Sequence, residues 1–130
     1  MSVVLRTAET LTPPPGYSHV AIATSGTLVF TAGAVPLDAA GNLVGEDDAV
    51  TQAEKVIENL LVALEEGRAQ AADIAKTTVY VAGASYQTQT DVWQVVRSSP
   101  IGRAPSTLVG VPTLGYRGQL VEIEAIAIVD

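Results

Sequence analysis

The stretch of sequence that decides the fold is the C-terminal Leu120-Val121-Glu122-Ile123-Glu124-Ala125-Ile126-Ala127-Ile128. Successive side chains of a β-strand point to opposite faces, so the odd positions of this stretch, all of them apolar, share one face. The even positions share the other face, and apart from the two glutamates they are apolar as well. Apolar residues on both faces predict a strand that is covered on both sides.

Glu122 and Glu124 are the residues of this strand that carry chemistry. They place two carboxylates about 7 Å apart on a surface that is not simply solvent. Burial disfavours the charged form of a carboxyl group, which makes each of them a candidate proton donor or acceptor. Two structural alternatives stay open: the carboxylates form ion pairs with Arg or Lys, or they line a wet axis between copies of the chain.

Upstream of this strand, periodicity and turn residues predict one α+β domain over residues 1–130 with the element order β-ββ-α-β-α-ββ. The Ser25-Gly26 turn signal predicts that the second and third strands form a hairpin. Strands are expected at 2–7, 18–24, 28–34, 73–82, 106–111 and 120–129, and part of a second helix is expected at 91–97.

The clearest helix covers residues 50–64, where apolar side chains recur every three or four positions and form one stripe. Acidic residues at 46–48 lie at its positive end, and Thr51 with Glu54 offers an alternative start as a capping box. Gly67, followed by Arg68, predicts the end of the helix.

The composition predicts an oligomer and disfavours several classes of partner. Charged residues make up 16% of the chain, below the usual quarter, while hydrophobic residues make up 48%. A small chain with so few charges is expected to bury its apolar excess between copies. The net charge of −7 leaves no basic footprint for nucleic acid or for an anionic membrane. The N-terminus resembles no targeting signal, which predicts a cytoplasmic protein.

Cofactor and nucleophile motifs are absent from the sequence. The chain has no cysteine, which excludes disulfides, thiolate metal sites and cysteine nucleophiles. His19 is the single histidine and cannot form a conventional metal site, so we interpret it as structural. The hydroxyl residues form no nucleophile elbow, and the glycines form no phosphate-binding loop. Tyr17, which follows a triple proline, is either a packing residue or part of a pocket.

Six segments in this order resemble the RidA/YjgF family, and together they cover almost the whole chain. The most specific are the Lys-Thr-Thr-Val-Tyr-Val of residues 76–81 and the Val-Glu-Ile-Glu-Ala of residues 121–125. The full set comprises Gly16-Tyr17-Ser18, Phe30-Thr31-Ala32-Gly33-Ala34-Val35-Pro36, residues 52–60, residues 73–81, Arg103-Ala104-Pro105-Ser106-Thr107-Leu108-Val109 and residues 121–127.

The resemblance implies a chorismate-mutase-like fold, in which a single sheet is packed by two helices, and a homotrimer with small-molecule clefts at its subunit interfaces. Well-studied members hydrolyse reactive enamines and imines, such as 2-aminoacrylate, to keto acids and ammonia, and no metal or organic cofactor is implied. By motif, Glu122 would position a water or a proton. The substrate-binding positions would be Tyr17, Ala32, Gly33, Pro105, Ser106 and Thr107.

The chain departs from the family pattern at the residue before Ser106. The family's arginine, which binds the substrate carboxylate with two parallel hydrogen bonds, is expected there, and this sequence has Pro105. Proline has neither a charge nor a backbone donor, so it cannot replace the arginine. Arg103 and Arg117 are the candidate substitutes for binding an anion. The chain therefore resembles a branch that lacks the deaminase arginine, and we expect little activity on 2-aminoacrylate.

Three functions are consistent with this pattern. The first is an enzyme that hydrolyses a neutral or larger imine or enamine. The second is a non-catalytic trimer that binds a metabolite or acts like a chaperone. The third, a ribonuclease or translation inhibitor, is disfavoured by the acidic charge and by the 5% content of aromatic residues.

Overall fold

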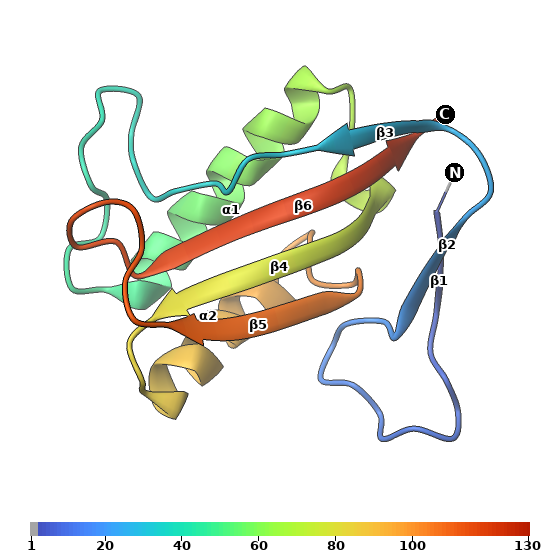
Figure 1. Cartoon of the computed structure of the whole chain (residues 1–130), viewed down its shortest axis with the longest axis horizontal. Coiled ribbons are helices and arrows are strands. Elements are labelled where there is room, and N and C mark those ends of the chain that lie inside the picture. The colour runs from blue at the N-terminus through green and yellow to red at the C-terminus, as the bar shows by residue number, and fades with distance from the viewer. Residues whose placement is uncertain (1–2) are drawn as a thin grey trace.

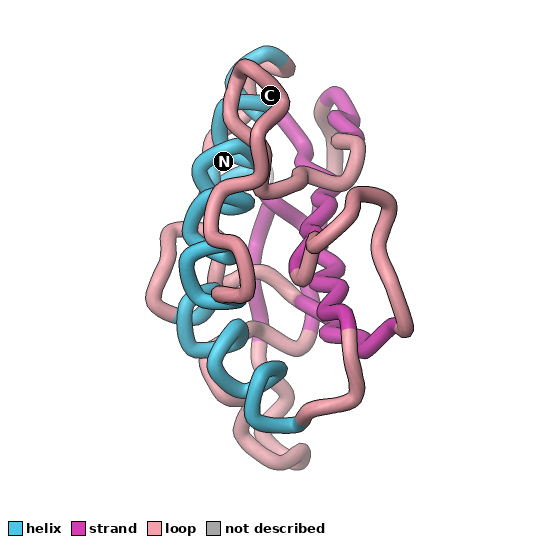
Figure 2. Tube along the Cα trace, turned by 90° about the vertical axis from the view of Figure 1, so that its left-hand side faces the viewer, coloured by secondary structure: helices cyan, strands magenta, loops and turns pink. Residues whose placement is uncertain are grey.

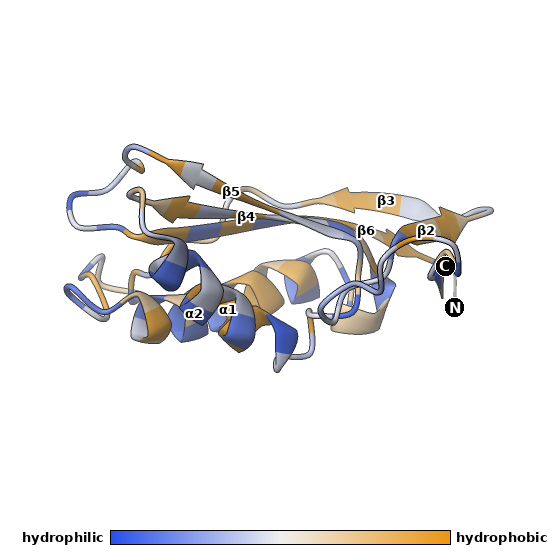
Figure 3. Cartoon of the chain, turned by 90° about the horizontal axis from the view of Figure 1, so that it is seen from below, coloured by the Kyte–Doolittle hydropathy of each residue, from blue (hydrophilic) through white to orange (hydrophobic). Residues whose placement is uncertain are grey.

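The structure, a computed structural model that describes residues 3–130, has two layers: a four-stranded sheet and two helices packed against one of its faces (Figures 1 and 3). Figure 2 shows the helices on one side of the molecule and the strands on the other. The elements are β1 (Val3–Arg6), β2 (Val20–Ala23), β3 (Thr27–Phe30), α1 (Ala49–Glu66), the 3-10 turn η1 (Ala71–Asp73), β4 (Ile74–Ala82), α2 (Tyr86–Arg97), β5 (Ser106–Val111) and β6 (Val121–Val129).

This order confirms the predicted β-ββ-α-β-α-ββ arrangement and the α+β class. The predicted start of the first strand at Ser2 lies outside the described residues. Neither helix of the described chain is long and apolar enough to cross a membrane.

β6 lies inside the sheet, whose strand order is β3-β6-β4-β5 (Figure 1). It pairs antiparallel with both β3 and β4, and β4 pairs with β5 in parallel. Its odd positions are buried, whereas its even positions are only partly covered. The helices therefore cover one face of β6, and the chain itself leaves the other face open (Figure 3).

The predicted hairpin between the second and third strands is wrong, and the sheet on which the two helices pack contains four of the six strands. β2 pairs with β1 in a separate two-stranded sheet, and β3 pairs with β6. The chain turns at Gly26, whose φ is 123°, and the strands before and after this turn belong to different sheets. The register sets Leu28 against Ile128 and Phe30 against Ile126, so the apolar side chains of β3 face those of an inner strand.

The core lies between the helices and the odd face of β6. Its largest buried side chains include Val56, Leu60 and Leu64 of α1, Val92 and Val96 of α2, and Val79, Val81, Val121 and Ile123 of the sheet. The apolar stripe predicted for the first helix is therefore confirmed as the face that packs against the sheet.

At the N-terminal end of α1 the capping residue differs from the predicted alternative. Asp48 is the N-cap residue: its Oδ1 accepts a hydrogen bond from the Thr51 amide at 3.1 Å and its Oδ2 accepts one from the Thr51 hydroxyl at 2.7 Å. These bonds lower the pKa of Asp48. The capping box of Thr51 with Glu54 is therefore wrong, because Thr51 already lies inside the helix. Gly67 ends the helix as predicted.

α2 begins at Tyr86, earlier than the predicted residue 91, with Ser85 as its N-cap residue. The first turn reads Tyr-Gln-Thr-Gln-Thr and has no apolar periodicity that could reveal a helix. Only the later part of α2, with its buried Val92 and Val96, carries that signal.

Gln52 is a fully buried amide that ties α1 to the loop before β6. Its Nε2 donates to the carbonyls of Gly45 and Gly118, each at 3.0 Å, and its Oε1 accepts from the Leu120 amide at 2.7 Å. The side chain therefore fixes the segment from which Glu122 projects two residues later.

Gln52→Leu is expected to lower the free energy of unfolding by about 3 kcal/mol, because it leaves two carbonyls and one amide buried without partners. Urea unfolding at a fixed protein concentration measures the change. Gln94→Leu, at an exposed position of α2, is the matched control and should change stability by less than about 0.5 kcal/mol. Equal effects of the two substitutions would contradict this role for Gln52.

Candidate functional site

A polar cluster of Tyr80, Glu122 and Glu124 lies on the open face of the sheet. Tyr80 is the register partner of Glu122, and Thr78 is that of Glu124. The Tyr80 hydroxyl donates to Glu124 Oε1 at 2.9 Å, and Gln119 Nε2 donates to Glu122 Oε1 at 3.0 Å. Within residues 3–130, neither glutamate lies in ion-pair contact with a Lys or Arg. The ion-pair alternative is therefore not what this chain forms by itself.

Tyr80, which the sequence analysis did not single out, contacts only one of the two glutamates through a hydrogen bond. Its hydrogen bond to Glu124, followed by burial and the charges of both glutamates, raises the pKa of Tyr80. Tyr80 consequently stays protonated and keeps one Glu124 oxygen engaged. In the described chain, Glu122 Oε2 accepts no hydrogen bond, so it is the carboxylate oxygen that a ligand can use.

Gly33 and Glu122, both predicted site residues, are brought together. The segment after β3 stays paired with β6, since the Ala34 amide donates to the Ile123 carbonyl at 2.7 Å. This pairing sets Gly33 so close to Glu122 that a Cβ atom on residue 33 would overlap the carboxylate group. Glycine is thus required for Glu122 to occupy its position. Ala32, the neighbouring predicted residue, is exposed beside this pair.

Tyr17 lies on the other side of the sheet, in a cavity of about 380 Å³ that we call the Tyr17 cavity. Its ring packs edge-to-face on Trp93 with centroids 5.8 Å apart, and Trp93 Nε1 donates to the Pro15 carbonyl at 2.8 Å. Tyr17 therefore both packs and lines a cavity. The lining consists of Pro15, Tyr17, Tyr86, Gln89, Thr90, Trp93, Gln94, Ser106 and Leu108.

The alternation of β5 divides the remaining predicted residues between these two sides. Ser106 points toward the helices, where its Oγ accepts from the Thr77 hydroxyl at 2.7 Å and where it lines the Tyr17 cavity. Thr107 points to the open face and accepts from Lys76 Nζ at 2.7 Å. Pro105 is buried, and its carbonyl accepts from the Thr77 amide at 3.0 Å.

The predicted residues therefore form two groups on opposite faces of the sheet. Gly33, Glu122 and Thr107 lie on the open face, which we call the Glu122 face. Tyr17 and Ser106 lie on the helical side. A single described chain does not join them in one cleft.

The two arginines proposed as substitutes for the missing one lie in loops that precede β5 and β6. Arg103 is exposed at the edge of a cavity beside β1 and η1. Arg117 is exposed in the loop 112–120, where it lines a cavity of about 380 Å³ together with Gln119. Whether either side chain contacts a ligand stays a prediction.

Lys76 is the basic residue that sequence reasoning missed. Among the four strands of the larger sheet it is the only Lys or Arg. The bond between the Thr77 amide and the Pro105 carbonyl places it beside Pro105, and it reaches Thr107 on the open face. The register of β4 against β5 carries this information, and no single-strand pattern reveals it.

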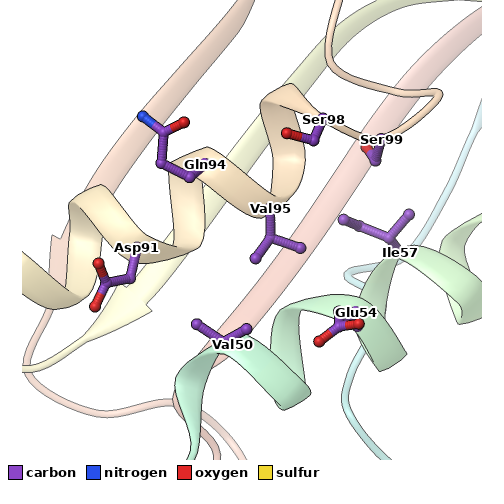
Figure 4. Close-up of a pocket in the computed structure, with 8 residues that line it drawn as sticks. All are labelled: Val50, Glu54, Ile57, Asp91, Gln94, Val95, Ser98 and Ser99. Carbon is purple, nitrogen blue, oxygen red and sulfur yellow. The ribbon is translucent and has the colours of Figure 1, made fainter.

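A groove of about 650 Å³ between α1 and α2 contains none of the predicted residues (Figure 4). The carboxylates of Glu54 in α1 and Asp91 in α2 line the groove together with apolar side chains. The lining residues are Val50, Glu54, Ile57, Asp91, Gln94, Val95, Ser98 and Ser99. Among the described residues, no group of three or more His, Asp or Glu side chains is arranged to hold a metal ion.

Comparison with known proteins places the chain in a family. The sequence profile of the family described as Endoribonuclease L-PSP, to which the RidA/YjgF proteins belong, matches residues 7–129. The chain belongs to this family. The prediction made from the six sequence segments is thereby confirmed.

Solved structures of RidA-family proteins share the fold. A Rid-family protein of unknown function from Yersinia pestis, YyfB, is 31% identical, covers 99% of this chain and 100% of its own, and superposes with a TM-score of 0.89. A putative endoribonuclease from Thermotoga maritima is 30% identical over 96% of this chain and 93% of its own, with a TM-score of 0.70. The predicted chorismate-mutase-like fold class is confirmed by these matches.

A curated relative is Protein DfrA from Myxococcus xanthus, which is 29% identical over 114 residues, or 86% of this chain and 84% of its own length. The match thus extends over most of both chains.

Proposed function

We propose that this RidA-family protein is a homotrimer whose interface clefts bind and hydrolyse an imine or enamine other than 2-aminoacrylate. One observation carries the proposal: the family's site residues lie on opposite faces of a single chain. A cleft that contains both Glu122 and Tyr17 therefore needs two subunits, with the Glu122 face of one subunit meeting the Tyr17 side of the next.

The apolar part of the open face supports assembly. Phe30 and Leu28 are 67% and 58% exposed, and they lie beside Ile126 and Ile128 in register. An uncovered group of large apolar side chains on a sheet marks an interaction surface. Packing this face against other copies would remove its apolar area from water, at roughly 25 cal/mol per Å².

Glu122 is the proposed proton carrier. Its Oε2 takes a proton from water as the water oxygen bonds to the imine carbon, the C=N electron pair moves to the nitrogen, and the Glu122 carboxyl group passes that proton to the nitrogen. The restored carboxylate then takes the hydroxyl proton of the carbinolamine and passes it to the amino nitrogen, so that the C=O bond forms as the C–N bond breaks and ammonia leaves. The products are a carbonyl compound and ammonia. An enamine first gains a proton at carbon and loses one from nitrogen, which converts it into the imine.

Pro105 determines the proposed substrate class. A neutral or larger substrate does not need the two parallel hydrogen bonds that an arginine would give to a small carboxylate. The cleft uses no metal or organic cofactor in this proposal. Arg103 and Arg117 stay candidates for contacts with a larger substrate, and Lys76 adds a third cation beside Pro105.

The test compares 2-aminoacrylate with its neutral carboxamide, each formed in situ by β-elimination, and follows ammonia release with and without the protein. We expect the protein to accelerate hydrolysis of the carboxamide at least about tenfold. We expect no acceleration for 2-aminoacrylate, because its carboxylate lacks the arginine contact, and losing a charge-assisted contact costs about 1.5–3 kcal/mol. Rapid hydrolysis of 2-aminoacrylate would contradict the role given to Pro105, and Lys76→Met would then test whether Lys76 supplies the charge.

The alternative is a trimer that binds a metabolite, or acts like a chaperone, without turnover. It predicts that the carboxamide raises the melting temperature of the protein but releases ammonia no faster than in buffer. The ribonuclease function suggested by the family's description is disfavoured by the net charge of −7. We further propose that residues 1–130 form one domain and that the protein is cytoplasmic. We propose no nucleic-acid or membrane partner for it.

A further inference from the structure

A cavity of about 590 Å³ lies where β1 approaches η1, the start of β4 and the loop after α2. Eight of its nine lining residues are apolar, and Arg103 is the only charged one; we call it the Arg103 cavity. It shares no lining residue with the Tyr17 cavity and none with the Glu122 face. It is therefore a separate feature of the molecule.

Small side chains explain why this space stays open. β1 contributes Val3 and Leu5 to the lining, and the small side chains of Ala71 in η1 and of Ala104 in the loop between α2 and β5 line the cavity as well. Val3 and Ala104 are each only 3% exposed, so the cavity reaches the edge of the core. A volume of this size falls within the range of small-molecule sites, about 300–1,000 Å³.

Arg103 gives this apolar cavity its charged side chain. Its backbone carbonyl accepts from the Ser18 amide at 2.9 Å, which anchors the residue at the cavity edge. Within residues 3–130 its guanidinium makes no ion pair. A guanidinium has five N–H donors and pairs with a carboxylate through two of them.

We propose that the Arg103 cavity is a second ligand site, which binds an amphiphilic monocarboxylate: the carboxylate pairs with Arg103 and the hydrocarbon part fills the apolar walls. An apolar wall with one cation at its edge matches a molecule with an apolar body and one anionic end. A neutral hydrocarbon leaves the guanidinium unpaired, and a free phosphate makes no use of the walls. Its test by ligand binding does not depend on imine hydrolysis or on the assembly proposed above, in which Arg103 is one candidate contact for the substrate.

The first test is isothermal titration calorimetry of the full chain with butanoate, hexanoate and octanoate, and with octan-1-ol as the neutral match. Affinity is expected to rise about fourfold per added methylene group, the equivalent of about 0.8 kcal/mol. Octanoate should bind at least about tenfold more tightly than octan-1-ol. Equal affinity of octanoate and octan-1-ol, or no dependence on chain length, would overturn the proposal.

Variants then locate the site. Arg103→Gln should reduce octanoate binding to the level of octan-1-ol, whereas the matched Arg117→Gln should leave it unchanged. Ala72→Trp, at an exposed position of the lining, should block both ligands by filling the cavity. If Thr90→Trp in the Tyr17 cavity blocks octanoate while Ala72→Trp does not, the ligand binds elsewhere and the assignment is wrong.

Discussion

Replacing Glu122 by glutamine is expected to lower kcat/KM for hydrolysis of the neutral carboxamide by about two to four orders of magnitude. General acid–base catalysis by one positioned side chain contributes about that factor. Glutamine keeps the shape of the side chain but cannot take a proton from water. Gln119 can still hold residue 122 through its side-chain amide, so the loss reports the missing carboxylate and not a displaced strand.

The matched control for this prediction is Glu124→Gln, on the same face and the same strand. The Tyr80 hydroxyl already engages Glu124, which gives that carboxylate a positional role. Its replacement should cost less than about tenfold in kcat/KM. The expected readout is ammonia release under single-turnover and steady-state conditions, with gel filtration to verify that both variants assemble like the wild type. Equal losses for the two variants, or an active Glu122→Gln, would contradict the assignment.

The strand β6 shows what a local pattern can predict. Its alternation correctly predicted the buried odd positions. The prediction that the face of Glu122 and Glu124 is covered as well is not met within one chain, which covers that face only in part, so its cover by other subunits stays a prediction. The stripe of α1 and the end at Gly67 were predictable for the same reason, since both depend on neighbours within a few residues. Such local signals, taken in order, were enough for the fold class and for the family.

Pairing between distant segments was not predictable. The turn at Gly26 was interpreted as a hairpin, although β3 finds its partner in β6 about one hundred residues later along the chain. The same limit applies to the site. The strand pattern singled out Glu122 and the family resemblance singled out Tyr17, but only the sheet shows that they lie on opposite faces. The position of Lys76 beside Pro105 depends on the register of two parallel strands, which no pattern within either strand encodes.

The open sheet face gives the second large prediction: Phe30→Glu is expected to convert the protein from trimer to monomer. Phe30 is 67% exposed in the isolated chain, so its replacement removes little packing from the fold itself. In the proposed trimer each copy would bury this ring beside Ile126. A carboxylate at this position buries no apolar area and has to be desolvated on assembly. Over the three copies, the free energy of trimer formation should become less favourable by an amount on the order of 10 kcal/mol.

Light scattering coupled to gel filtration measures the outcome, since a monomer has a mass of 13.4 kDa. Val62→Glu is the matched control: Val62 is 62% exposed on α1, on the helical side, and the same substitution there should leave the trimer intact. A wild-type monomer, or a trimeric Phe30→Glu variant, would rule out assembly through this face. If Phe30→Glu is a folded monomer, the rate of carboxamide hydrolysis should also fall, although Glu122 is unchanged. The reason is that no second subunit then supplies the Tyr17 side of the cleft. A monomer that keeps the full rate would show that one chain is sufficient for the site.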